Sequence, residues 1–273
     1  MMKSMLLKCK CIAFILLMGL ISQQILGQNK LTSKKDNTVI LYITRHGKTI
    51  LNTMDRVQGW ADTPLTPEGV QVAEFLGMGI KEVNFKSAYS SDLGRARQTA
   101  RIVLDTKGQS DLKIVEVPQI RETNFGSYEG DLNSKMWGDA ALYLHYKSSK
   151  ELFTDMNKNP DVLKNAMATF KTLETLGIGE NYDDVKARGQ KAIRQIAENE
   201  AASGGGNVLI VGHGMSISVF LSDLDSNGKN ISGTHMGNAA VCKVIYKNGK
   251  FTIESFGDMS YVEKGKQISE KKK

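Results

Sequence analysis

The sequence predicts an α/β fold in which helices cover both faces of a sheet. Two short apolar runs rich in β-branched residues, at 39–43 and 208–211, have the length and composition of buried strands. Segments whose apolar residues follow a helical spacing separate these two strands and the other expected ones. With 273 residues, the chain can bury one substantial core.

The expected elements alternate between strands and helices. A helix is expected to begin at Pro67, because Thr66 is a good N-cap and proline suits the first helical position. Asp92 is expected to cap a later helix that contains Arg95. Asn248-Gly249 is typical of a tight hairpin turn between the last two strands. In order, we expect strand 39–43, a helix from 67, strand 85–90, a helix from 92, strand 114–117, a helical region at about 131–182, helix 184–202, strand 208–211, and strands 240–246 and 251–256.

The N-terminal segment, residues 1–27, has the pattern of a secretory signal peptide. Three lysines come first, the apolar stretch 11–20 follows, and Gly27 is a small residue beyond it. The apolar stretch is shorter than the roughly 20 residues that a membrane-spanning helix needs. We therefore expect a secreted or cell-surface protein, with residues 28–37 as a linker. An uncleaved N-terminal anchor is the alternative.

The charge of the chain indicates no nucleic-acid partner. The formal net charge is +7, and it falls to +4 when residues 1–27 are removed. The remaining excess lies largely at 263–273, where we expect a solvated, frayed basic tail after a folded domain at 38–262. Contact with a membrane is expected only if the N-terminal segment is uncleaved. Cys242 is the only cysteine after residue 27, so no internal disulfide is expected.

Polar residues suited to phosphate chemistry follow the two apolar strands directly. Arg45 and His46 come after the first strand, and His213 follows the second between two glycines. In an open α/β sheet, the carboxyl ends of the strands border the crevice in which ligands bind. A guanidinium group can bind a phosphate bidentately, and a neutral imidazole can attack phosphorus. The two strand ends together indicate a site for a phosphate ester.

Four motifs, taken together, resemble those of a known family. They are Thr44-Arg45-His46-Gly47, Ser91 to Thr99, Ile120 to Gly126, and Gly212-His213-Gly214. In type and order, from about residue 38 to about residue 240, they resemble the histidine phosphatase superfamily, the phosphoglycerate-mutase-like proteins. The resemblance implies a three-layer α/β/α sandwich with a mostly parallel central sheet. It also implies that the helical insertion at about 131–182 caps the active site.

The resemblance assigns roles to individual residues. His46 would attack phosphorus and form a phosphohistidine intermediate. Glu122 would protonate the leaving alkoxide and then activate water. The donors expected around the phosphoryl oxygens are Arg45, Asn52, Arg95 and His213.

Other chemistries fit the sequence less well. No pair of residues has a tight metal-ligand spacing such as His-x-x-x-His, and arginines in the site would repel a cation, so neither a metal nor another cofactor is expected. Residues 212–216 do not form the Gly-x-Ser-x-Gly elbow of serine hydrolases. His145 and His235 match no catalytic position, and we expect structural roles for them. Asn238 is expected to support the pocket.

We predict an exported histidine phosphatase that hydrolyses small phosphomonoesters. The segment from Phe125 to Gly130 looks like the phosphatase branches of the superfamily, and no proline-rich segment typical of mutase branches precedes Pro160 in the insertion. Phosphoglycerate mutase is the alternative enzyme. A non-catalytic protein that binds a phosphate ligand on the same fold is the other alternative. Glu122 speaks against it, because binding alone has no chemical need for that carboxyl group.

Overall fold

The computed structural model describes residues 37–226, 228 and 236–271. The expected signal peptide, the linker up to residue 36, His235 and the last two residues of the basic tail lie outside the described residues. Among the helices that are described, none is both long enough and apolar enough to cross a membrane.

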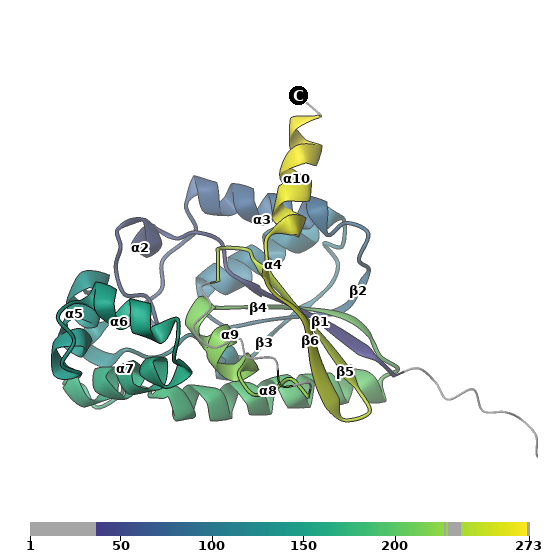
Figure 1. Cartoon of the computed structure of the whole chain (residues 1–273). Helices are drawn as coiled ribbons and strands as arrows, with labels where there is room; N and C mark the ends of the chain where they lie inside the picture. The colour runs from purple at the N-terminus through teal and green to yellow at the C-terminus, as the bar shows by residue number, and fades with distance from the viewer. Residues whose placement is uncertain (1–36, 227, 229–235, 272–273) are drawn as a thin grey trace, which may run out of the picture. The chain divides into compact units, whose positions relative to one another are not determined.

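A six-stranded sheet lies at the centre of the fold (Figure 1). Its strands are β1 (Val39–Arg45), β2 (Phe85–Ser90), β3 (Ile114–Glu116), β4 (Gly206–Gly212), β5 (Val241–Lys247) and β6 (Lys250–Asp258). The order is β3-β2-β4-β1-β5-β6; neighbours among the first four are parallel, and β5 is antiparallel to both β1 and β6. This confirms the mostly parallel sheet. Arg45 is opposite Gly212 in the register, so β1 and β4 end side by side.

Helices cover both faces of the sheet, as expected. In Figure 1, α3 (Pro67–Gly79), α4 (Gly94–Lys107) and α10 (Ser260–Glu270) lie on one face, and α8 (Tyr182–Ala202) and α9 (Gly214–Leu221) lie on the other. Successive residues of β1 join opposite cores: Leu41 and Ile43 pack with the residues of α8 and α9, and Tyr42 packs with those of α3 and α4. Because both faces are buried, the central strands are apolar almost throughout.

Three helices form the insertion after β3. They are α5 (Asn133–Tyr143), α6 (Ser149–Met156) and α7 (Pro160–Leu173), and they lie together at one end of the sheet in Figure 1. Their apolar faces share a separate core around Phe170, which includes Met136 of α5, Leu152 of α6 and Val219 of α9. The short elements α2 (Ile50–Thr53), η1 (Pro118–Ile120) and η2 (Gly126–Tyr128) lie in the connections around the site.

The capping of α4 differs from the expectation. Asp92 does not cap this helix, because its carboxylate is paired with the guanidinium group of Arg121. The N-cap is Leu93, whose side chain makes no capping hydrogen bond. Instead, the carboxylate of Asp62 accepts the backbone N–H of Gly94 from a separate loop. A partner distant in the sequence therefore takes the place of the expected local cap.

The expected frayed tail is also wrong for residues 263–270. They belong to α10, which packs on α3. Val262 and Gly265, three positions apart on one face of α10, are buried, whereas Lys264 and Lys266 are exposed. The lysines thus occupy the solvent side of an amphipathic helix. The hairpin is confirmed: Asn248 and Gly249 both adopt the positive φ that a tight two-residue turn requires.

Candidate active site

The ends of β1 and β4 bring the two motif histidines together. The centroids of the His46 and His213 rings are 5.2 Å apart. The backbone N–H of His46 donates to the Gly212 carbonyl oxygen at 3.0 Å, which extends the pairing of the two strands beyond β1. Gly214 leaves room for Arg45, since a Cβ there would lie 3.3 Å from the Arg45 Cδ and Nε atoms. The parallel register therefore assembles this part of the site.

His46 has the state that a nucleophile needs. Its Nδ1 is 2.7 Å from the Gly47 carbonyl oxygen. That oxygen can only accept, so we assign the proton to Nδ1 and the lone pair to Nε2. Burial and the positive charges of Arg95 and Arg45 lower the pKa of His46 well below 6.5, which keeps the ring neutral. The Asn238 side chain donates to the His46 carbonyl oxygen at 3.0 Å, in line with the expected support.

His213 is fully buried beside His46, and both of its ring nitrogens lack a hydrogen-bond partner within the described residues. Burial lowers the pKa of His213 well below 6.5, and the charge of Arg95 adds to this effect. A buried polar group without a partner is uncommon in a folded protein. At the strand ends, both ring nitrogens are therefore available for a hydrogen bond.

Two arginines are held beside the histidines. The fully buried Arg95 donates from Nη1 to Asp62 Oδ1 at 2.9 Å and from Nη2 to the Gly59 carbonyl at 2.7 Å. Arg45 donates from Nη1 to the Met236 carbonyl at 2.7 Å. Nε of each arginine is buried and has no partner in the part of the chain that the structure describes. Burial lowers the pKa of both groups, as expected for cations that have lost water and would gain from an anion.

Glu122 lies at the N-terminus of α9. Its Oε1 accepts the N–H of Ser216 at 2.7 Å and that of Thr123 at 2.9 Å, and its Oε2 accepts the N–H of Met215 at 3.1 Å. These contacts fix the orientation of the carboxyl group. Glu122 also lines the cavity described below, with Arg45. The structure therefore places it where a substrate can reach both residues.

Asn52 reaches the same cavity from α2. It forms a capping box with Thr49, in which its side-chain oxygen accepts the Thr49 N–H at 3.3 Å. The group that Asn52 can offer to a ligand is therefore its amide NH2, a donor, as the sequence indicates.

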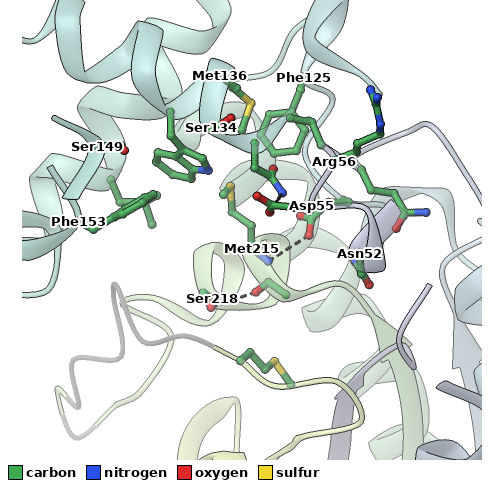
Figure 2. A pocket seen from close by; sticks show the side chains of 18 of the residues that line it. Asn52, Asp55, Arg56, Phe125, Ser134, Met136, Ser149, Phe153, Met215 and Ser218 are labelled. Atoms are coloured by element: carbon green, nitrogen blue, oxygen red, sulfur yellow. Dashed lines mark hydrogen bonds between the residues drawn. The ribbon is translucent and has the colours of Figure 1, made fainter. Parts of the chain in front are cut away.

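A cavity of about 670 Å³ extends from these residues toward the helical insertion (Figure 2). Arg45, Asn52 and Glu122 line it on the sheet side, and α5 and α6 supply much of the rest. His46, Arg95 and His213 are almost completely buried and are not among the residues that line the cavity. Of the other basic residues in this region, Arg56 lines the cavity, with Nη1 donating to the Gly130 carbonyl at 2.7 Å.

Two residues that sequence reasoning missed hold Arg95 in place. Asp62 binds its guanidinium group directly. The carboxylate of Glu129 accepts four backbone N–H groups, those of Gly59, Trp60, Ala61 and Phe125, at 2.8–3.1 Å. The carbonyl groups of Gly59 and Ala61 in turn accept from Arg95. Glu129 therefore holds in place the loop at 59–61, whose carbonyl groups accept hydrogen bonds from Arg95.

Arg188 of α8 holds the segment that carries Glu122. Its guanidinium donates at 2.8 Å to the carbonyl groups of Gln119, Arg121 and Glu122, and it also pairs with Glu180. No local pattern marks Arg188 or Asp62, because each acts on residues far along the chain.

The described residues contain no group of three or more His, Cys, Asp and Glu side chains arranged to hold a metal ion.

Comparison with known proteins identifies the family to which the chain belongs. The model of the histidine phosphatase superfamily (branch 1) matches residues 41–151 and 144–259, and the chain belongs to that superfamily. A metal-independent phosphoserine phosphatase of Arabidopsis thaliana is 30% identical over 229 residues, which cover 81% of this chain and 82% of that protein. A protein of Erwinia tasmaniensis, named a probable phosphoglycerate mutase, is 27% identical over 232 residues, with 82% and 94% covered.

A crystal structure of phosphoglycerate mutase from Bacillus anthracis (strain Sterne) has the same fold, with a TM-score of 0.77. It is 43% identical in sequence, and the match covers 86% of this chain and 99% of that one. The phosphoglycerate-mutase-like fold is thereby confirmed. Since both phosphatases and mutases occur among the similar proteins, these similarities leave the choice of reaction to the residues of the site.

Proposed function

We propose that the protein is a phosphatase that hydrolyses small phosphomonoesters through a phosphohistidine on His46. The observation that carries this proposal is the set of buried donors without partners around a neutral histidine. Nε of Arg45, Nε of Arg95 and the ring of His213 lack partners among the described residues and lie next to His46. This arrangement suits the three oxygens of a phosphoryl group in transfer.

In the first step, Nε2 of His46 attacks phosphorus and the bond from phosphorus to the ester oxygen breaks. The leaving alkoxide takes a proton from Glu122. In the second step, Glu122 accepts a proton from water as that water attacks phosphorus. The bond between phosphorus and Nε2 then breaks, and inorganic phosphate and free His46 result. The arginines and His213 would stabilise the transferring group in both steps.

The charge of the cavity supports a phosphatase over a mutase. Mutase branches of the superfamily commonly carry further basic residues, and a substrate with a carboxylate besides its phosphate calls for cations outside the catalytic cluster. Arg56 is the only basic residue besides Arg45 among the described residues that line the cavity.

The test is a panel of phosphomonoesters with protein lacking residues 1–27, with and without a chelator. We expect release of inorganic phosphate that the chelator does not reduce. His46→Asn should lower kcat/KM by more than about a thousandfold, as the loss of a nucleophile does elsewhere. His145→Asn is the matched control, since that histidine lies outside the cavity.

Phosphate bound to the protein supplies a second measurement. Rapid quenching should trap acid-labile phosphate on the unchanged protein and on His145→Asn, but not on His46→Asn. Phosphoryl transfer between phosphoglycerates without release of phosphate would favour the mutase. Binding of phosphate esters without turnover would favour the non-catalytic alternative.

We also propose export through the segment at residues 1–27. The support is the order of its basic, apolar and small residues. Sequencing of the N-terminus of protein recovered outside the cell tests this proposal, and a start near Gln28 is expected. Recovery of the complete N-terminus in the membrane fraction would favour an uncleaved anchor.

A further inference from the structure

The cavity wall opposite the catalytic residues is aromatic and rich in sulfur. Trp137 of α5 and Phe153 of α6 line it on the side of the insertion. Met136 of α5 and Met156 of α6 line it as well, whereas Met215 and Met236 border the cavity beside Glu122 and Arg45. Figure 2 shows Phe153, Met136 and Met215 around the open space, with Asn52 and Arg56 on the other side. The insertion side of the cavity thus presents a cluster of apolar side chains, among polar ones such as Asn133, Ser134 and Ser149.

Trp137 is held rigidly within this wall. Its ring makes edge-to-face contacts with Phe153 and with Phe170, each at 4.9 Å between centroids. Such contacts orient an aromatic ring and add to the stabilisation from burial. The methionines are flexible by comparison and can adapt to the outline of a bound group. A fixed aromatic ring beside adaptable side chains suits a flat apolar group.

The charges on the cavity wall do not favour an anionic alcohol. Arg56 is already bonded to the Gly130 carbonyl, and the neighbouring Asp55 adds a negative charge to the lining. Asp55 Oδ1 accepts from the Asn133 side chain at 2.8 Å, which keeps the carboxylate at this position. A substrate carboxylate placed against the aromatic wall would lose water without gaining a cation, and that desolvation is costly.

The volume of the cavity also favours a bulky group over a small one. At about 670 Å³ it lies in the range of roughly 300–1,000 Å³ that is typical of pockets for drug-sized ligands. A three-carbon alcohol would leave most of this space unfilled. An aromatic group would remove apolar surface of the wall from water, which is favourable.

We infer that the substrate of this site is a phosphomonoester whose alcohol carries an aromatic or similarly bulky apolar group, seated against Trp137 and Phe153. The inference rests on the proposed function, because it names the substrate class of the same site. Its phosphoryl group would bind at Arg45, Arg95 and His213, and its alcohol would extend into the cavity beside the insertion.

The experiment compares propyl phosphate with phenylpropyl phosphate. Both release a primary alkoxide, so the two esters differ in the distant phenyl group and hardly in the chemistry of the leaving oxygen. We expect kcat/KM to be at least about tenfold higher for phenylpropyl phosphate, in the range of a well-filled apolar pocket. Phosphoserine and phosphoglycerate serve as small, charged comparators and should be poorer than phenylpropyl phosphate.

Variants test whether Trp137 and Phe153 cause the preference for phenylpropyl phosphate. Trp137→Ala and Phe153→Ala should each lower the ratio of the two kcat/KM values by at least about fivefold. The ratio distinguishes loss of the wall from partial misfolding, which lowers both values together. Leu142→Ala is the matched control, because Leu142 is on α5, is 77% exposed and does not line the cavity. It should leave the ratio unchanged.

Three results would overturn the inference while leaving the proposed function intact: equal kcat/KM for the two alkyl esters, a preference for phosphoserine or phosphoglycerate, or an unchanged ratio in both alanine variants. A failure of the proposed function gives a different result. In that case no ester in the panel releases phosphate and no acid-labile phosphate forms on His46, and the inference fails with it.

Discussion

At the scale of single residues, the site depends on a neutral histidine surrounded by cations. Burial and two arginines keep His46 unprotonated, and the Gly47 carbonyl oxygen holds the proton on Nδ1. The same arginines lack a partner at Nε among the described residues. One cluster thus prepares the nucleophile and the donors for the phosphoryl group. The cluster in turn depends on carboxylates such as Glu129, which do not line the cavity.

Glu129→Gln tests whether this carboxylate positions Arg95. Each of its oxygens accepts two backbone N–H groups, and an amide NH2 cannot replace one of those oxygens. The loop at 59–61 should shift, and its hydrogen bonds to Arg95 should weaken. We expect kcat/KM to fall by about tenfold to a hundredfold, less than the loss of a direct donor costs. Inhibition by inorganic phosphate, measured in parallel, should weaken.

Glu174→Gln is the control for this change. Glu174 is buried and likewise accepts backbone N–H groups, those of Ser127, Leu176 and Gly179, but it has no contact with the loop at 59–61 among its hydrogen bonds. The Glu174→Gln substitution should change the inhibition by inorganic phosphate only slightly. If both variants weakened phosphate inhibition equally, Glu129 would be an ordinary structural residue.

At the scale of elements, the last helix shows how a charged segment becomes part of the fold. In α10, the backbone at Gly265 lies directly against α3, and a Cβ at that position would be 1.7 Å from the Phe75 carbonyl oxygen. Gly79 of α3 contributes a similar close approach to Tyr261. Because two helix backbones meet through glycines, the contact needs this residue and not merely a small apolar one.

Gly265→Ala should therefore destabilise the protein, although alanine favours a helix more than glycine does. We expect the free energy of unfolding to fall by about 1–3 kcal/mol, the usual cost of overpacking. Gly138→Ala in α5 is the opposite control, since nothing lies within 4 Å of a Cβ there. It should stabilise by about 0.5–1 kcal/mol. Urea denaturation measures both, and a neutral Gly265→Ala would contradict the packing of α10 on α3.

At the scale of the whole molecule, the buried histidines link stability to pH. In the folded protein burial lowers the pKa of His46 and His213 well below 6.5, whereas the unfolded chain regains the ordinary value. Above that ordinary pKa, the two histidines are neutral in both the folded and the unfolded state. They then add no pH dependence to the free energy of unfolding. As the pH falls below that pKa, the unfolded state binds protons that the folded state does not. The free energy of unfolding must then decrease.

Urea denaturation between about pH 7.5 and about pH 5.5 measures this link. Each of the two histidines should contribute a loss approaching about 1.4 kcal/mol per pH unit below its ordinary pKa. The double variant His46→Asn with His213→Asn should lose most of that slope, and His145→Asn should retain it. An equal slope in the double variant and the unchanged protein would show that the two rings are not buried in the neutral form.

The sequence by itself determined the features that depend on near neighbours. The apolar runs before Arg45 and before His213 specify buried strands, Thr66 caps its own helix, and Asn248-Gly249 makes its own turn. In each case the decisive hydrogen bonds and apolar contacts lie within a few residues, so a local pattern suffices. The family motifs then indicated which side chains meet at the ends of β1 and β4.

Only the tertiary structure decided what surrounds those side chains. Asp62 reaches α4 across 32 positions, and Glu129 reaches its loop across about 70. The cavity combines residues of α2, α5, α6 and α9, and the lysine-rich end becomes a helix because α3 offers it a matching face. The physical reason is that a carboxylate, an aromatic ring or a helix face can bind any of many partners. The packing of the whole chain selects one of them, and no pattern within a segment records that choice.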